Sequence, residues 1–185
     1  MIDKMIVDAD LCIKLGSSST YRFLYDILPL IADRIYMHSY AQSEVMMPQS
    51  AVEQLNELIS ESKIIIVNEN HLKPADRMIY SNTYKMLADL MIDPARPTKN
   101  KGEVSSLAYA KTVSLPVFAT DEMNLQPIID KKLNTGIDDI HCLRISDIIG
   151  MAHNGELNLP RKICKALWVI AGKNKRIFDR DIWPL

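Results

Sequence analysis

The 185-residue sequence has few cysteines and glycines, and it lacks a long hydrophobic run. Cys12, Cys142 and Cys164 are odd in number, widely spaced and set in apolar runs. This pattern indicates buried thiols in a reducing compartment, without a Cys-x-x-Cys zinc or redox motif. No apolar run approaches the ~20 residues that a membrane span needs, and the amino terminus lacks the apolar core of a signal peptide. We therefore expect a cytoplasmic protein with no membrane partner.

Several sequence motifs that bind nucleotides or metals are also absent. No Gly-x-Gly-x-x-Gly or Gly-Lys-Ser/Thr loop is present to hold phosphates, and the four histidines show no paired zinc-ligand spacing. The net charge of −1 gives no attraction of the whole molecule for nucleic acid. Residues 161–180 carry seven lysines and arginines against Asp179 alone. This stretch could contact phosphates, but a solvated helix face is the simpler interpretation.

Short apolar runs alternate with helical patterns along nearly the whole chain. The predicted strands are 5–7, 35–37, 63–67, 117–119 and 140–143. The predicted helices are 21–32 with Thr20 as its cap, 39–47, one capped by Ser50, 74–91, 103–111, one beginning at Thr120 or Asp121, one from Ser146, and 160–171. This alternation predicts an α/β fold, with three α/β/α layers around a mostly parallel central sheet.

Four acidic residues have informative positions relative to these strands. Asp8 ends the first strand, and Asp121 ends the strand 117–119. Glu44 follows the second strand by about half a dozen residues, and Glu103 begins a helix. Because the carboxyl ends of parallel strands lie along one edge of a sheet, acids that are distant in sequence can meet there.

Each acid also has a simpler structural explanation. Asp8 and Asp121 could cap helices, Glu103 could stabilise a helix amino terminus, and Glu44 could be an exposed helical residue. Taken singly, these explanations are preferable. The order of the four acids along the chain favours a shared site.

That order carries a resemblance to a known family. The runs that carry it are Ile6-Val7-Asp8-Ala9-Asp10-Leu11, Ser43-Glu44-Val45, Lys101-Gly102-Glu103-Val104-Ser105-Ser106-Leu107-Ala108-Tyr109-Ala110 and Ala119-Thr120-Asp121. They resemble, in the same order, the four acidic positions of PIN-domain nucleases. The resemblance covers about residues 4–145, and each motif is short. The sequence departs from the commonest pattern in its third acid, which is Glu, and in a longer segment between residues 63 and 100. It also departs at Asp10, two residues after the first Asp, which could add a ligand or only cap a helix.

The resemblance implies a PIN-like nuclease domain over residues 1–145, with residues 146–185 as a helical extension packed on the same domain. It also implies a ribonuclease, toxin-like in kind, that cleaves single-stranded RNA with metal-activated water. RNA is then the expected partner, and an antitoxin-like protein and a second copy of the chain are further candidates.

The implied cofactor is Mg²⁺ or Mn²⁺. Carboxylates that crowd into one cleft repel each other unless a cation compensates, and ligand sets made only of oxygen favour hard divalent ions. We expect Asp8 and Asp121 to be direct ligands, with Glu44 and Glu103 completing the shell or orienting water. Cations in neighbouring segments that could contact phosphates, or could serve only solubility, are Lys14, Arg22, Lys99 and Lys101.

Two alternative functions remain open. Asp8-Ala9-Asp10 after a hydrophobic strand also fits a haloacid-dehalogenase-like phosphohydrolase, in which Asp8 is the nucleophile and Asp10 the acid. That interpretation gives Glu44 and Glu103 no task. The second alternative is a non-catalytic PIN-like binding module, which would gain no thermal stability from Mn²⁺.

Overall fold

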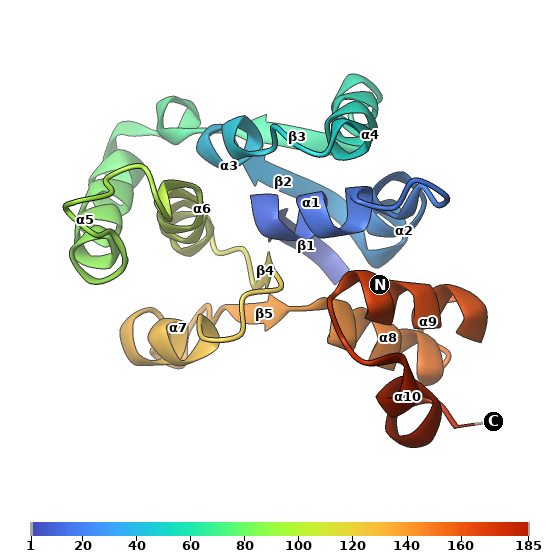
Figure 1. Cartoon of the computed structure of the whole chain (residues 1–185). Coiled ribbons are helices and arrows are strands. Elements are labelled where there is room, and N and C mark those ends of the chain that lie inside the picture. The colour runs from blue at the N-terminus through green and yellow to red at the C-terminus, as the bar shows by residue number, and fades with distance from the viewer. Residues whose placement is uncertain (1, 185) are drawn as a thin grey trace.

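The computed structural model describes residues 2–184 as one parallel sheet between two helical layers (Figure 1). The strands are β1 (Ile2–Val7), β2 (Ala32–His38), β3 (Ile64–Val67), β4 (Val117–Ala119) and β5 (His141–Leu143). They pair in the order β3-β2-β1-β4-β5, and every pairing is parallel. The predicted α/β class and parallel sheet are confirmed.

Helices cover both faces of the sheet. One layer contains α1 (Ala9–Gly16), α2 (Phe23–Ile31), α4 (Gln49–Ser60), α8 (Ile145–His153) and α9 (Arg161–Ile170). The other layer contains α5 (Pro74–Met91), α6 (Lys101–Thr112) and α7 (Gln126–Lys132). The short elements are α3 (Ser39–Glu44), η1 (Glu69–His71), α10 (Lys175–Ile177) and the π-helical turn η2 (Phe178–Ile182).

β1 is the central strand, and its side chains supply both cores. Met5 and Val7 pack into the hydrophobic cluster of the α1 layer, whereas Ile6 packs into the cluster of the α6 layer. Successive side chains of a strand point to opposite faces, so a strand covered on both sides is apolar throughout. This explains why the sequence shows an uninterrupted apolar run before Asp8.

The strand order also locates the place where the chain reverses direction across the sheet. From β1 the chain adds β2 and β3 on one side and later adds β4 and β5 on the other. In open parallel sheets, ligands bind outside the carboxyl ends of the strands at this switch point. Asp8 follows β1 and Asp121 follows β4, so both lie beside it.

Several predicted helix boundaries are wrong. Residues 9–16 form a helix that was not predicted, and the helix expected at Thr120 or Asp121 begins at Gln126 instead. Thr20 does not cap α2, which has Arg22 at its N-cap. Ser50 does not cap α4 either, because its hydroxyl donates to the carbonyl of Gly16 at 2.6 Å.

The C-terminal residues pack on the same hydrophobic cluster as β1. Buried side chains of α8, α9 and η2 belong to that cluster. Arg161 and Lys165 both pair with Asp179, and Arg161 also donates to the carbonyl of Trp183. The Trp183 ring contacts His153 edge to face. Arg161 and Lys165 of α9 therefore hold residues 179–183 against this helix.

In the span from residue 2 to residue 184, no helix combines the length and the apolar character that crossing a membrane requires.

Gly16 allows a close contact between α1 and α4. A Cβ atom at this position would lie 2.4 Å from the Cα and Cβ of Ala51 on α4. Because backbone atoms cannot yield as a flexible side chain does, we expect Gly16→Ala to lower the free energy of unfolding by about 1–3 kcal/mol. Urea unfolding measures this. The matched control is Gly150→Ala in α8, where a Cβ meets nothing within 4 Å. That variant should be neutral or slightly stabilising.

Candidate acidic site at the carboxyl edge of the sheet

Asp8 is a buried carboxylate at the end of the central strand. Asp8 is 2% exposed, and its backbone N–H donates at 2.9 Å to the carbonyl of Ala119, the last residue of β4. Oδ2 accepts a long hydrogen bond of 3.5 Å from the Thr120 hydroxyl, whereas Oδ1 finds no hydrogen-bond partner among the described residues. Asp8 occupies the N-cap position of α1 but makes no capping hydrogen bond. Helix capping therefore does not explain this residue.

The electrostatic surroundings of Asp8 disfavour its charged form. Burial, followed by the negative charge of Glu103, raises the pKa of Asp8 well above its usual range. Glu44 and Asp10 add to the rise, and the nearby backbone N–H of Ala9 opposes it. Together with Asp8, these acids come from three separate motifs of the predicted pattern. Their charges act on one buried oxygen pair, as expected if they surround a common site.

Glu44 is held in place by the backbone of α6. Its Oε1 accepts the N–H of Gly102 at 3.0 Å, which ties the last residue of α3 to the first turn of α6. Burial raises the pKa of Glu44, while this hydrogen bond opposes the rise. Glu44 is thus partly buried and hydrogen-bonded. The simpler explanation, a freely exposed helical residue, is wrong.

Gly102 leaves just enough room for this contact. A Cβ atom at residue 102 would lie 2.5 Å from Oε2 of Glu44 and 2.8 Å from its Cδ. Only a residue without a side chain permits the carboxylate to sit over this backbone. The Gly102-Glu103 pair therefore places two acids at once: Glu44 by its hydrogen bond, and Glu103 by the chain itself.

Glu103 lies in the first turn of α6 and has a raised proton affinity. Burial, followed by the charges of Glu122, Glu44 and Asp10, raises the pKa of Glu103 to about 7, against an opposing effect of Lys99. Glu103 also lines an open cavity of about 340 Å³ together with Lys99 and Asn124. Half-protonated carboxyls near neutral pH are common at functional sites.

Asp121 is buried beside the same strand ends but faces a cation. Its Oδ2 accepts from Lys14 Nζ at 3.1 Å, and the same ammonium donates to Asp10 at 2.9 Å. Its Oδ1 accepts the backbone N–H of Ile145 at 3.3 Å. Asp121 therefore does serve a helix amino terminus, but it is that of α8 and not of the helix expected to follow it.

The four predicted acids are thus divided into two groups. Asp8, Glu44 and Glu103 influence each other directly, whereas Asp121 joins the site through Thr120, its neighbour in the chain, and through Lys14. Across residues 2–184, no three His, Cys, Asp or Glu side chains lie close enough together to hold a metal ion as a group. Joint metal binding by the quartet stays a prediction.

The chemistry of these groups nevertheless suits a hard divalent cation. The available donors are carboxylate oxygens, and Oδ1 of Asp8 is a buried acceptor that no described group satisfies. Lys14 already supplies a positive charge at Asp121 and Asp10. Asp10, the acid of the phosphohydrolase alternative, is thereby engaged with Lys14.

The cations predicted to contact phosphates separate in the structure. Arg22 pairs with Glu57 on α4 and belongs to another part of the surface. Lys14 is bonded to two acids, and Lys99 lines the cavity beside Glu103. Lys101 lies over the ring of Tyr40, with its Nζ 3.8 Å from the ring centroid. Thr120 and Gly102 were not predicted as parts of the site, although both lie within the motifs that carry the resemblance.

The raised pKa of Glu103 predicts a pH-dependent stability of the metal-free protein. The folded pKa of about 7 exceeds the ordinary value of 4.5, so the stabilisation is complete below about pH 4.5 and is lost as the pH rises through 7. At pH 8 we expect Glu103→Gln to raise the free energy of unfolding by about 1–2 kcal/mol, after allowing for partial solvent exposure. At pH 5 the difference should be small. Urea unfolding in EDTA at both pH values measures it, with the exposed Glu156→Gln as control. An equal effect at both pH values would contradict the proposed cause.

Comparison of the chain with family models, with curated proteins and with solved structures found no match. The function is therefore inferred from the fold and from the acidic site.

Proposed function

We propose that the chain is a metal-dependent ribonuclease of the PIN-domain type, with Asp8, Glu44, Glu103 and Asp121 as its acidic residues. The observation that carries this proposal is Asp8, a carboxylate 2% exposed with one oxygen unpartnered among residues 2–184. It stands at the switch point of a parallel sheet and within the field of two further acids. Burying such a group is costly unless a cation or proton compensates it.

The four acids share two tasks in this proposal. Asp8 would bind Mg²⁺ or Mn²⁺ directly, and Asp121 would do so after exchanging its contact with Lys14. Glu44, fixed by Gly102, and Glu103 would complete the shell or orient water. When bound, the ion supplies an activated water and offsets the charge of the phosphodiester.

The residues themselves also prepare the site for an anionic substrate. The pKa of Glu103 near 7 lets this carboxyl hold or release a proton at neutral pH. Lys99 and Lys101 precede Glu103 closely in the chain, at the start of α6, and can approach the phosphates of the RNA backbone. The non-catalytic alternative has no use for an unpaired buried carboxylate, which makes it the weaker explanation.

The test is cleavage of a labelled single-stranded RNA with Mn²⁺, with Mg²⁺ and with EDTA. We expect cleavage that requires the metal and leaves a 5′-phosphate and a 3′-hydroxyl, with duplex RNA as the comparison substrate. Cleavage that persists in EDTA, or products with a 2′,3′-cyclic phosphate, would contradict the proposal. Hydrolysis of a phosphomonoester, with RNA left intact, would favour the phosphohydrolase instead.

A further inference from the structure

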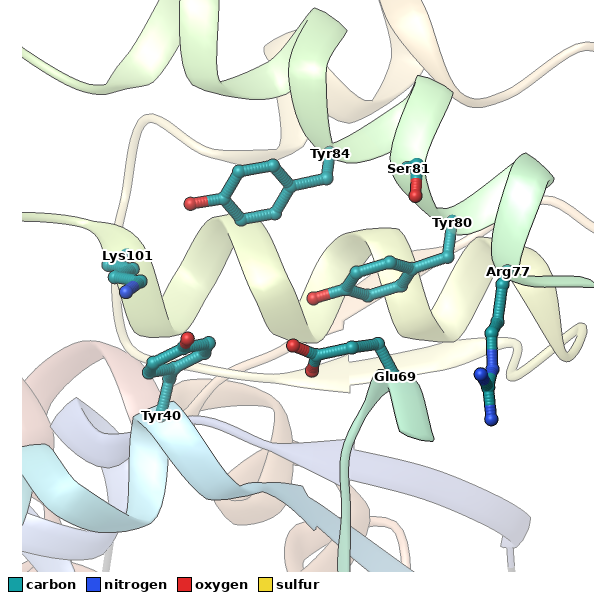
Figure 2. Close-up of a pocket in the computed structure, with 7 residues that line it drawn as sticks. All are labelled: Tyr40, Glu69, Arg77, Tyr80, Ser81, Tyr84 and Lys101. Carbon is teal, nitrogen blue, oxygen red and sulfur yellow. The ribbon is translucent and has the colours of Figure 1, made fainter. Parts of the chain in front are cut away.

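A second pocket lies next to the acidic site. It has a volume of about 360 Å³, within the range of roughly 300–1,000 Å³ usual for small-molecule sites. Figure 2 shows residues from four elements converging on it: α3, η1, α5 and the start of α6. The residues that matter here are Tyr40, Glu69, Arg77, Tyr80, Tyr84 and Lys101.

Three tyrosine rings give the pocket its character. Tyr84 and Tyr80 follow each other on one side of α5, with ring centroids 6.1 Å apart and planes inclined by 27°. Tyr40 faces them from α3 (Figure 2). Tyr84 is only partly buried, so part of its ring is open to a ligand. The Tyr40 ring is stacked on His38 and lies under Lys101, so it borders the pocket without offering a free face. Exposed aromatic rings are the surfaces on which unpaired nucleobases stack.

Cations lie at the margin of the same pocket. Lys101 contacts the Tyr40 ring, and within residues 2–184 it has no carboxylate partner. The guanidinium of Arg77 is fixed by the carbonyls of Leu72 and Asn70, at 3.0 and 2.8 Å. Both side chains keep their positive charge available for a phosphate group.

One carboxylate, Glu69, points into the pocket below the Tyr80 hydroxyl, toward Tyr40 and away from Arg77 (Figure 2). Its nearest basic group is Nε2 of His38 at 3.7 Å. His38 is buried, and burial lowers its pKa to about 4, so at neutral pH it is uncharged and does not neutralise Glu69. Glu69 is therefore an anionic hydrogen-bond acceptor beside an aromatic surface.

We propose that this pocket binds an unpaired guanine base of the RNA, stacked on Tyr84, with Glu69 accepting hydrogen bonds from its Watson–Crick edge. Guanine presents two adjacent donors there, N1–H and the exocyclic N2 amine, which match the two oxygens of a carboxylate. Adenine offers one amine beside an acceptor nitrogen, and uracil offers a single N–H between two carbonyls. A carboxylate therefore discriminates in favour of guanine.

The pocket is joined to the acidic site through two elements. Tyr40 and Glu44 belong to the same helix, α3, four residues apart. Lys101 directly precedes Gly102 and Glu103 in α6. A strand of RNA whose base occupies the pocket would thus have its backbone phosphates near Lys101 and the acids. The inference deepens the proposed ribonuclease function by giving it a base preference, and it rests on that function.

The test measures equilibrium binding of mononucleotides in EDTA, so that it does not depend on catalysis. The probes are GMP, IMP, AMP and ribose 5-phosphate. IMP keeps N1–H but lacks the N2 amine, and ribose 5-phosphate has no base. We expect GMP to bind about tenfold or more tightly than AMP, with IMP between them and ribose 5-phosphate weakest. No saturable binding of GMP, or equal affinity for GMP and AMP, would overturn the proposal.

Variants locate the binding and separate its two components. Glu69→Gln should remove the preference for GMP over AMP, because an amide offers one acceptor and adds a donor. Tyr84→Ala should weaken GMP and AMP alike, by about fivefold or more. Tyr25→Ala is the matched control, since Tyr25 is also a partly buried tyrosine on a helix, but lies on α2 under Arg22 and Lys63 and does not line this pocket. If Tyr25→Ala weakens GMP as much as Tyr84→Ala does, the pocket assignment fails.

This design distinguishes failure of the pocket from failure of the nuclease. If the protein cleaves RNA with metal but binds GMP no more tightly than AMP, only the proposed base site is refuted. The expected GMP series, in a protein that cleaves no RNA, would leave a guanine-binding site and remove the proposed nuclease function.

Discussion

Asp8→Asn is expected to reduce Mn²⁺-dependent cleavage of single-stranded RNA by about 10²–10³-fold or more, as the loss of one strong electrostatic group at a reacting centre usually does. The physical reason is the position of Asp8 at the end of the central strand. It is the most deeply buried of the acids and has an oxygen unpartnered in the described chain. An amide is nearly isosteric but uncharged, so it retains the packing and loses the attraction for a cation.

The same substitution should leave the fold intact. Without metal, Asp8→Asn removes a charge that is repelled by Glu103 and Glu44, and thermal unfolding in EDTA should occur at an equal or higher temperature than in the wild type. Asp3→Asn is the control, because Asp3 lies exposed on the same strand and pairs only with surface cations, Arg34 and Lys4. Cleavage by Asp8→Asn at the rate of Asp3→Asn would refute the proposed site.

Gly102→Ala is expected to lower cleavage by about 10–100-fold, the range typical of groups that orient a metal ligand. The new Cβ would meet Oε2 of Glu44 at 2.5 Å, and the carboxylate is the flexible end of a side chain. Glu44 would swing aside and lose its hydrogen bond from the residue 102 N–H, so activity should fall more than stability. Steady-state kinetics and urea unfolding of the same samples compare the two.

A double-mutant cycle identifies Glu44 as the route of this effect. In a background where Glu44→Ala has already removed the carboxylate, Gly102→Ala has nothing left to displace. We expect the double variant to be no slower than Glu44→Ala alone. Fully additive losses would show that Gly102 acts on some other part of the protein.

The main outline of the fold could be predicted because buried parallel strands leave a clear trace. Met5-Ile6-Val7 is apolar throughout since both faces of β1 are covered. Helix starts were harder to predict, because they depend on distant partners. Ser50 looks like a cap in the sequence, yet its hydroxyl bonds to Gly16, 34 residues away. The start of α7 at Gln126 has a local signal that was overlooked, the proline at residue 127.

The candidate site was predictable to the extent that it follows strand ends. Asp8 and Asp121 lie beside the β1–β4 switch point as the order of strands and acids indicated. The contact of Asp121 with Lys14 joins residues 107 positions apart, and no local pattern encodes it. The tyrosine pocket is of the same kind, since Tyr40 and Tyr84 are far apart in the sequence and meet only because α3 and α5 both pack beside α6.

The account depends above all on a divalent cation reaching Asp8, and anomalous diffraction from a crystal soaked in Mn²⁺ tests this most directly. We predict one strong anomalous peak at the carboxyl edge of β1 and β4, coordinated by Oδ1 of Asp8 and by at least one of Glu44, Glu103 and Asp121. An edge without such a peak, in crystals where Mn²⁺ binds only elsewhere on the molecule, would contradict it.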